Sequence, residues 1–311
     1  MKIKIIAALF VLIICGWAVY VIGSNGSADN VEVEAIQHLP IENTQPHWGN
    51  LLESPPLPDG VEFCGEALPL HLYWVKEGLD RELIIHCFQH SRTLLTLKRS
   101  TRFFPVIEKI LKEENLPEDL KYLCVAESNL ENVVSPAKAT GFWQFMESTG
   151  KAYGLEINEH VDERYHLEKA TRAACQYLKK LRKQFGNWAL AAAAYNMGEG
   201  ALANNIQEQQ VNNYWNLFLN QETSRYVNRC VSYKLIFENQ DLYNIRIAAH
   251  EFYKPIDYKE IVVTQTIEDL RTYCIENNIL YRQLKELNPW LRSTKLPVRN
   301  HKEYVLRVAK Q

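Results

Sequence analysis

Helical periodicity dominates the chain between Leu70 and Asn239. Apolar residues recur there at spacings of three and four, and no convincing run of alternating residues interrupts them. Glycines and prolines punctuate the pattern where helices are expected to stop: Gly78, Pro117, Pro136, Gly154 and Gly186. We therefore expect one large helical domain, over residues 61–245.

The pattern changes after Tyr258. Residues 260–264 form a short run rich in β-branched side chains, two short helical patterns follow, and residues 303–307 have the pattern of a closing strand. This order predicts a small β-α-α-β unit over residues 256–311. The expected fold class is mainly α, with a large helical domain and this small C-terminal unit.

The first residues are apolar enough to enter a membrane. Lys2 and Lys4 precede an uncharged run over residues 5–22, close to the roughly 20 residues that a membrane-spanning helix needs. A retained anchor and a cleaved signal peptide both begin this way, so residues 1–23 are expected to be one or the other. Either one exports the rest of the chain. Residues 24–60 are polar and rich in proline, as is typical of a linker.

Composition narrows the possible partners and cofactors. The net charge of −2 gives no reason to expect a nucleic-acid partner, since phosphate binding requires a clustered positive surface. Six cysteines follow the N-terminal segment without a CxxC pair or a metal-ligand spacing. Export permits disulfides among them, but the pairing cannot be deduced. Four of them fall in helical patterns and are expected to be small buried residues.

A metal site is one alternative that the spacing leaves open. His86, Cys87 and His90 lie on one stretch of predicted helix, where two histidines four residues apart can share an ion. A zinc site requires three or four ligands, and no further partner is evident. We therefore expect core or cleft-rim histidines, no metal and no other cofactor.

A carboxylate interrupts the apolar face of the helix predicted after Pro117. Leu120, Leu123, Cys124 and Glu127 lie at positions i, i+3, i+4 and i+7, so they share one face. Burial there disfavours the charged carboxylate and should raise the pKa of Glu127, as a general acid near neutral pH requires. The alternative is a glutamate at the helix end that reaches solvent or pairs with an arginine. The spacing does not decide between the two.

Three further segments carry side chains that suit a sugar-binding cleft. Residues 141–146 place three aromatic side chains beside Gln144, which is consistent with sugar contacts and also with an ordinary core turn. Tyr195 and Asn196 end a run of small residues, where they either donate hydrogen bonds into a cleft or terminate the helix. Tyr226 lies on the expected buried face of the last long helix.

The order of these segments resembles one enzyme family. The motifs are a Glu-Ser pair at Glu127, Gly-x-x-Gln-x-Met from Gly141, Ala-Tyr-Asn-x-Gly around Tyr195, and Glu-Thr-x-x-Tyr-Val from Glu222. Together they resemble the soluble-lytic-transglycosylase (goose-lysozyme-like) domains, and the resemblance is dense over residues 59–241. Supporting stretches are residues 97–105, 132–136 and 161–169.

This resemblance implies a lysozyme-like helical fold and an enzyme that acts on the glycan strands of peptidoglycan. It implies cleavage of the β-1,4 bond between N-acetylmuramic acid and N-acetylglucosamine without addition of water. Glu127 would protonate the departing glycosidic oxygen and then take the proton of the substrate's C6 hydroxyl, which attacks C1. Most glycosidases use two carboxylates instead. The family also implies a place in the bacterial cell envelope, on the periplasmic side of a membrane.

The same resemblance implies a set of substrate-binding residues. Ser128 would support the muramic acid side, and Gln144 and Met146 would line the cleft. Tyr195 and Asn196 would hydrogen-bond near the reacting sugar.

Other residues are expected to support the site. Tyr226 would position Glu127 by a hydrogen bond, with Glu222 as a structural partner. Gly141 would let the backbone lie close to the sugar. Trp143 occupies a position where relatives vary among apolar residues, so a tuning role is expected there.

Two questions remain open at this point. The C-terminal unit loosely resembles a LysM glycan-binding module in residues 264–270 and 284–290, but it contains no glycine and lacks the usual Gly-Asp turn. Glycan binding and a packing or spacer role are therefore both possible for it. The activity itself has two rivals, a lysozyme with Glu131 or Glu147 as a second acid and an inactive glycan-binding scaffold, although a scaffold would be expected to lose Glu127 or Tyr195.

Overall fold

The computed structural model describes residues 53–310. The helical region begins after a small hairpin of β1 (Glu62–Phe63) and β2 (Glu66–Ala67). Its helices follow in chain order: α2 (Tyr73–Phe88), α3 (His90–Glu113), α4 (Lys121–Ser128), α5 (Glu147–Ala152), α6 (Leu167–Phe185), α7 (Trp188–Met197), α8 (Glu199–Gln209) and α9 (Gln221–Glu238). Short 3-10 turns lie between them at Glu118–Leu120, Glu163–Tyr165 and Tyr214–Asn216, and another follows α9 at Ala249–Glu251.

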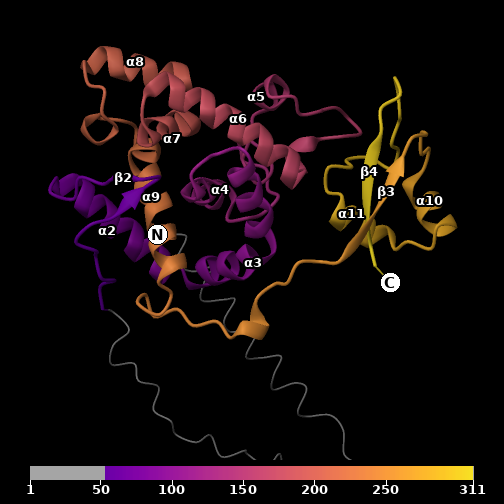
Figure 1. The fold of residues 1–311 in the computed structure, drawn as a ribbon, viewed down its shortest axis with the longest axis horizontal. Coiled ribbons are helices and arrows are strands. Elements are labelled where there is room, and N and C mark those ends of the chain that lie inside the picture. Colours follow the sequence, from indigo (N-terminus) through magenta and orange to yellow (C-terminus); the bar gives the residue numbers. More distant parts are fainter. Residues whose placement is uncertain (1–52, 311) are drawn as a thin grey trace, which may run out of the picture. The chain divides into compact units, whose positions relative to one another are not determined.

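The helix α9 is the element against which much of this region packs. It contacts α2, α4 and α7, and Figure 1 shows it running beside them. Tyr226, Cys230 and Tyr233 on its inner face are at most 2% exposed, as the apolar spacing predicts. Residues 189–194 of α7 are also buried, and the five alanines among them let α6 and α9 approach α7 closely.

Gly78 does not stop a helix, contrary to the sequence-based expectation, because α2 continues through it. A Cβ at Gly78 would lie only 2.5 Å from Nδ2 of Asn228 in α9. The close packing of the two helices therefore accounts for this glycine. Gly186 does end its helix as predicted, since it follows α6 with a left-handed φ of 86°.

The C-terminal unit has the predicted β-α-α-β order. Strand β3 (Tyr258–Val263) pairs antiparallel with β4 (Tyr304–Ala309), and α10 (Leu270–Glu276) and α11 (Tyr281–Leu287) lie between them in the chain. Figure 1 shows both helices beside this two-stranded sheet. Together with the helical region, this confirms the expected fold class.

One loop of the helical region completes the core of the C-terminal unit. Val161 and Tyr165 belong to the same apolar cluster as Trp290. The backbone N–H of Asp162 donates to the carbonyl of Trp290 (2.9 Å), and the N–H of Arg292 donates to a carbonyl of the same loop. The unit therefore packs directly on the helical region.

The cysteines of the described residues are all free thiols. Four of them are buried: Cys124, Cys175, Cys230 and Cys274. This confirms the expectation of small buried residues.

The N-terminal predictions lie almost entirely outside the described residues. Residues 1–23 and most of the linker over residues 24–60 are in that part, and residues 53–60 contain no helix or strand. Over residues 53–310, no helix has both the length and the apolar character needed to span a membrane.

Candidate active site

Helix α4 presents Glu127 from its last turn. Leu120, Leu123 and Cys124 are fully buried on the face that they share with it, while Glu127 itself is only partly exposed. The helix ends at Ser128, and the next residue, Asn129, has a left-handed φ of 52°. The carboxyl therefore lies at the C-terminal end of the apolar face of a short helix, where it is only partly exposed.

Tyr226 of α9 contacts this carboxyl directly. Its hydroxyl donates a hydrogen bond of 2.6 Å to Oε1 of Glu127. Because Tyr226 is 1% exposed, its ring has little freedom and holds the hydroxyl in a fixed direction. The hydrogen bond expected from the sequence is thus present, between residues 99 positions apart.

Burial raises the pKa of Glu127 to about 7. The hydrogen bond from Tyr226 acts in the opposite direction because it favours the charged form, as does the positive charge of Arg229, whereas the negative charge of Glu222 raises the pKa. No described residue forms an ion pair with Glu127. The rise predicted from the helix pattern is confirmed, and the alternative of a glutamate paired with an arginine is not.

The arginine near Glu127 belongs to a buried ion-pair network that the sequence analysis missed. Glu82 of α2 is 0% exposed, and its Oε1 lies 2.7 Å from Nε of Arg225. Its Oε2 lies 3.8 Å from Nε of Arg229. Glu82 thereby compensates positive charge that would otherwise act on Glu127 alone.

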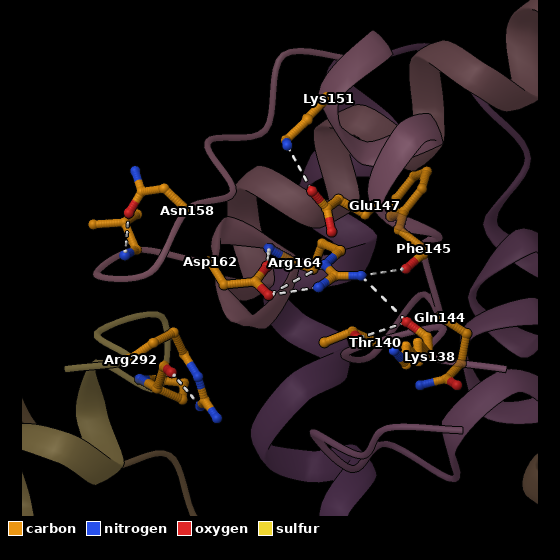
Figure 2. A network of polar contacts seen from close by, with 12 residues as sticks. Lys138, Thr140, Gln144, Phe145, Glu147, Lys151, Asn158, Asp162, Arg164 and Arg292 are labelled. Atoms are coloured by element: carbon orange, nitrogen blue, oxygen red, sulfur yellow. Dashed lines mark hydrogen bonds and ion pairs between the residues drawn. The ribbon is translucent and has the colours of Figure 1, made fainter. Parts of the chain in front are cut away.

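Arg164 holds the loop that carries Gln144 through hydrogen bonds to its backbone. The guanidinium donates to the carbonyls of Lys138 (3.3 Å) and Phe145 (3.2 Å), while Asp162 accepts from its other nitrogens at 2.7 and 2.9 Å. Figure 2 shows Arg164 between Asp162 and this loop. Arg164 lies in the stretch 161–169 that supports the family resemblance, but its role was not predicted.

Gly141 allows this loop to approach the Arg164 backbone. Its φ is +83°, and a Cβ there would lie 2.0 Å from the carbonyl oxygen of Arg164. The structure therefore gives Gly141 a packing reason that the sequence analysis did not anticipate. The proximity to a sugar that was expected for it stays a prediction.

Gln144 is fixed by the same loop. Its Nε2 donates to the carbonyls of Gly141 (2.7 Å) and Val133 (3.1 Å), and its own φ of 48° is left-handed. Its Oε1 has no hydrogen-bond donor among the described residues. Met146, at the start of α5, is 45% exposed.

Tyr195 and Asn196 both engage neighbouring protein groups. The Tyr195 hydroxyl donates to the carbonyl of Trp143 at 2.7 Å. Asn196 accepts from the hydroxyl of Thr223 at 2.8 Å and donates to Glu222 at 3.3 Å. Asn196 is thus placed beside the α9 turn that leads to Tyr226, and Glu222 has the structural contact expected for it.

Two of the expected residues are buried in the core. Ser128 is 3% exposed, and its hydroxyl donates to the carbonyl of Cys124. Trp143 is 0% exposed, and its indole N–H donates to the Thr171 hydroxyl at 2.9 Å. This indole is a core side chain, and the tuning role expected for Trp143 stays a prediction.

The two candidate second acids form ion pairs with basic side chains. Glu131 forms an ion pair with Arg99, and Glu147 pairs with Lys151 at 2.6 Å, as Figure 2 shows for the latter. Within residues 53–310, neither carboxylate forms a hydrogen bond with Glu127.

The candidate metal ligands also have ordinary contacts. His86 bonds to the Ser232 hydroxyl at 2.7 Å and stacks on Tyr233, and burial lowers its pKa to about 3. Among residues 53–310, no group of three or more potential ligands is close enough to hold an ion.

Replacing Tyr226 by Phe should raise the pKa of Glu127. The substitution keeps the ring but removes the hydroxyl that favours the carboxylate, so the pKa should rise above about 7 by roughly one unit. A carboxyl ¹³C NMR titration of both chains measures this. Tyr214→Phe, which removes a hydroxyl bonded to the Thr223 carbonyl, is the control. An unchanged pKa in Tyr226→Phe would contradict the electrostatic role of this bond.

Gly141→Ala should destabilise the fold more than Gly154→Ala. Both glycines have a φ of +83°, but a Cβ would meet the Arg164 carbonyl only at Gly141, whereas Gly154 has open space. We expect a loss of about 2–4 kcal/mol in unfolding free energy for Gly141→Ala, against about 1 kcal/mol of backbone strain for Gly154→Ala. Urea denaturation compares them, and equal losses would show that the close contact is unimportant.

Two stretches of the chain match protein-family models. Residues 104–218 match the Transglycosylase SLT domain, and residues 259–311 match the Soluble lytic transglycosylase C-terminal LysM-like domain. The first stretch contains Glu127, Gln144 and Tyr195.

Known lytic transglycosylases are similar to this chain in sequence or in structure. It is 36% identical over 201 residues to the membrane-bound lytic murein transglycosylase D of Escherichia coli, a match that covers 61% of this chain and 44% of that protein. The chain thus spans less than half the length of this relative. Two solved structures are also similar, and each match covers 49% of this chain and 26% of the chain in the solved structure. They are the lytic transglycosylase Slt of Pseudomonas aeruginosa (22% identity, TM-score 0.35) and the 70 kDa soluble lytic transglycosylase of Escherichia coli (20%, 0.38). This chain therefore contains a transglycosylase SLT domain followed by a soluble-lytic-transglycosylase C-terminal LysM-like domain.

Proposed function

We propose that this chain is a peptidoglycan lytic transglycosylase. It cleaves the β-1,4 bond between N-acetylmuramic acid and N-acetylglucosamine without water and leaves 1,6-anhydromuramic acid ends. The observation that carries the proposal is the Glu127 carboxyl, which has a pKa of about 7 and accepts a hydrogen bond from Tyr226. Near neutral pH such a group is readily available both as an acid and as a base. The SLT domain and the murein transglycosylase among the relatives support this chemistry.

The proton on Glu127 begins and ends the reaction. The carboxyl donates it to the glycosidic oxygen as the bond from C1 to that oxygen breaks. The resulting carboxylate takes the proton of the C6 hydroxyl of the same muramic acid, and the C6 oxygen forms a bond to C1. The products are a 1,6-anhydro ring and a free 4-hydroxyl on N-acetylglucosamine, with Glu127 protonated again. The substrate's own hydroxyl and N-acetyl group replace the second carboxylate.

Tyr226 stabilises the charged form of Glu127 during the reaction. Its hydroxyl donates to Oε1, so this bond strengthens when the carboxylate forms and leaves the other oxygen for the substrate. Arg229 stabilises the same charge from a greater distance, while Glu82 compensates part of the arginine's charge. The balance keeps the pKa close to the pH at which both roles are needed.

The surrounding residues give the sugar its contacts. Gln144 offers Oε1 as an acceptor because its amide nitrogen is already bonded to the loop, and the exposed Met146 provides an apolar surface. Tyr195 and Asn196 hydrogen-bond near the reacting sugar. Ser128 supports the muramic acid side indirectly, through the end of α4, since its hydroxyl is bonded within the helix.

A lysozyme would need a second acid placed to activate a water. Glu131 and Glu147 are each neutralised by a cation, which disfavours this activity. An inactive scaffold would not require a carboxyl with a raised pKa.

Digestion of purified peptidoglycan followed by mass spectrometry of the muropeptides tests the proposal. Wild-type chain should release products that end in 1,6-anhydromuramic acid, about 18 mass units lighter than hydrolysed ends because no water is added. Glu127→Gln keeps an acceptor for Tyr226 but cannot transfer a proton, so product formation should fall by at least about 100-fold. Glu131→Gln is the matched control and should keep its activity. Reducing ends from the wild-type chain would make it a lysozyme, and no products from folded protein would favour the scaffold.

We also propose that residues 1–23 place the enzyme at the periplasmic side of a bacterial membrane. Support comes from the length of the apolar run and from the membrane-bound relative. If the segment is a retained anchor, the full-length mass should be found in the membrane fraction, and alkaline carbonate should not extract it. A shortened chain in the soluble periplasmic fraction would show a cleaved signal peptide, and a cytoplasmic chain would contradict export.

A further inference from the structure

A pocket lies on the opposite side of α9 from Glu127. It has a volume of about 680 Å³ and is formed by the start of α2, the turn Tyr214–Asn216 with the loop to Leu219, and α9. The side chains that face it from α9 are Ser224 and Asn228. Glu222 and Tyr226 lie about half a helical turn away, on the face toward Glu127. The pocket and the candidate active site thus share the first turns of one helix.

The walls of this pocket are unusually rich in exposed aromatic rings. Tyr73 is 67% exposed, Trp74 is 47% exposed and Phe218 is 88% exposed, and all three line the pocket together with Trp215. Their exposure has no explanation in the folding of this chain, since large rings usually lie in the core. Clustering in one hollow indicates a ligand with apolar faces.

The rings are held in place across the pocket. The indole N–H of Trp74 donates to the carbonyl of Trp215 at 2.6 Å, joining segments 141 residues apart. Tyr73 meets Trp74 edge to face, with ring centroids 5.1 Å apart. The aromatic surface therefore exists before any ligand arrives, which lowers the entropic cost of binding.

A buried amide provides a polar group at the same place. Asn228 is 3% exposed, and its Oδ1 has no hydrogen-bond partner among the described residues. Its Nδ2 occupies the space that a side chain at Gly78 would fill. An unpaired buried oxygen is unfavourable. This cost is explained if the amide serves a ligand that brings its own polar groups.

We propose that this pocket is an accessory glycan site, which holds an N-acetylhexosamine unit of a peptidoglycan strand outside the catalytic cleft. The inference rests on the proposed function for the identity of the strand. Trp74 and Phe218 contact the apolar C–H face of the sugar, and the Asn228 amide hydrogen-bonds to a hydroxyl or to the acetamido group.

The lining favours a sugar over other occupants. Its charged residues are one acid and one base, Glu77 and Arg81, so the pocket selects no strongly charged ligand. A membrane surface would require only apolar side chains, whereas the Asn228 amide also lines this pocket. An uncharged ring with apolar faces and polar edges satisfies both features.

The pocket is also connected to the cleft through protein contacts. The Tyr214 hydroxyl donates to the carbonyl of Thr223 at 2.7 Å, and the Thr223 hydroxyl donates to Asn196 at 2.8 Å. A strand that leaves the cleft past the start of α9 would reach Phe218, which lies in the loop just before that helix. Binding at the pocket would keep long strands attached between cleavage events.

Binding of peptide-free glycan strands to the full chain tests this inference. The Glu127→Gln chain is titrated with strands by calorimetry, alone and with Trp74→Ala or Phe218→Ala added. Each ring removal should weaken binding about five- to tenfold. Phe88→Ala is the control, because Phe88 is also an exposed ring of α2, at 41%, but lies outside the pocket. Phe218→Ala is expected to fold normally because its ring is almost fully exposed.

Kinetics with the natural Glu127 separate the two proposals. In Phe218→Ala, the KM for long strands should rise while kcat and the cleavage of a tetrasaccharide, which fills only the cleft, stay unchanged. If Trp74→Ala and Phe218→Ala bound strands as tightly as Phe88→Ala does, the accessory site would be overturned and the proposed enzymatic function would be unaffected. If Phe218→Ala bound strands normally but no longer bound phosphatidylglycerol vesicles, the accessory site would be overturned in favour of a membrane-binding surface. Ring-dependent strand binding without any anhydro product would refute the function and keep the site.

Discussion

The free-energy cost of keeping the Glu127 carboxyl out of water governs the arrangement around it. The carboxyl occupies the position of an apolar residue on α4, so its charged form is disfavoured and its pKa rises to about 7. A single hydrogen bond from Tyr226 offsets part of this cost. That bond requires α4 and α9 to pack closely, and the buried face of α9 provides this packing. The catalytic property proposed for Glu127 therefore depends on the packing of the whole helical region.

The rest of the site is fixed by backbone contacts more than by direct contacts between functional side chains. Arg164 holds the loop of Gln144 through two carbonyls, and Gly141 permits the close approach that this requires. Loop 156–166 also carries the contacts to the C-terminal unit. Asp162 illustrates the link, because its side chain binds Arg164 while its N–H donates to the carbonyl of Trp290. The LysM-like unit thus packs on the same loop that supports one wall of the candidate site.

Glu82 shows why a sequence pattern could suggest Glu127 but could not establish its role. On α2, Val75, Leu79, Glu82 and Leu83 share a buried face, so a carboxylate again occupies an apolar position. The two glutamates differ in the groups that α9 places beside them. Glu82 receives Arg225 and Arg229 from α9, whereas Glu127 receives the uncharged hydroxyl of Tyr226. A buried carboxylate with arginine partners is an ordinary ion pair, and one with only a hydroxyl becomes a titrating acid.

The sequence alone determined the features that depend on local spacing. The helical region, the β-α-α-β unit, the end of α6 at Gly186 and the shared face of Leu120, Leu123 and Glu127 all follow from residues within one or two helical turns. Ordered motifs also indicated the domain family. Only the tertiary structure decided which distant groups meet: Tyr226 with Glu127, Arg164 with the Gln144 loop, Gly78 with Asn228 and Trp143 with Thr171. The physical reason is that a pKa, a close approach or the burial of an indole depends on atoms within a few ångströms, and those atoms lie 19 to 150 residues away along the chain.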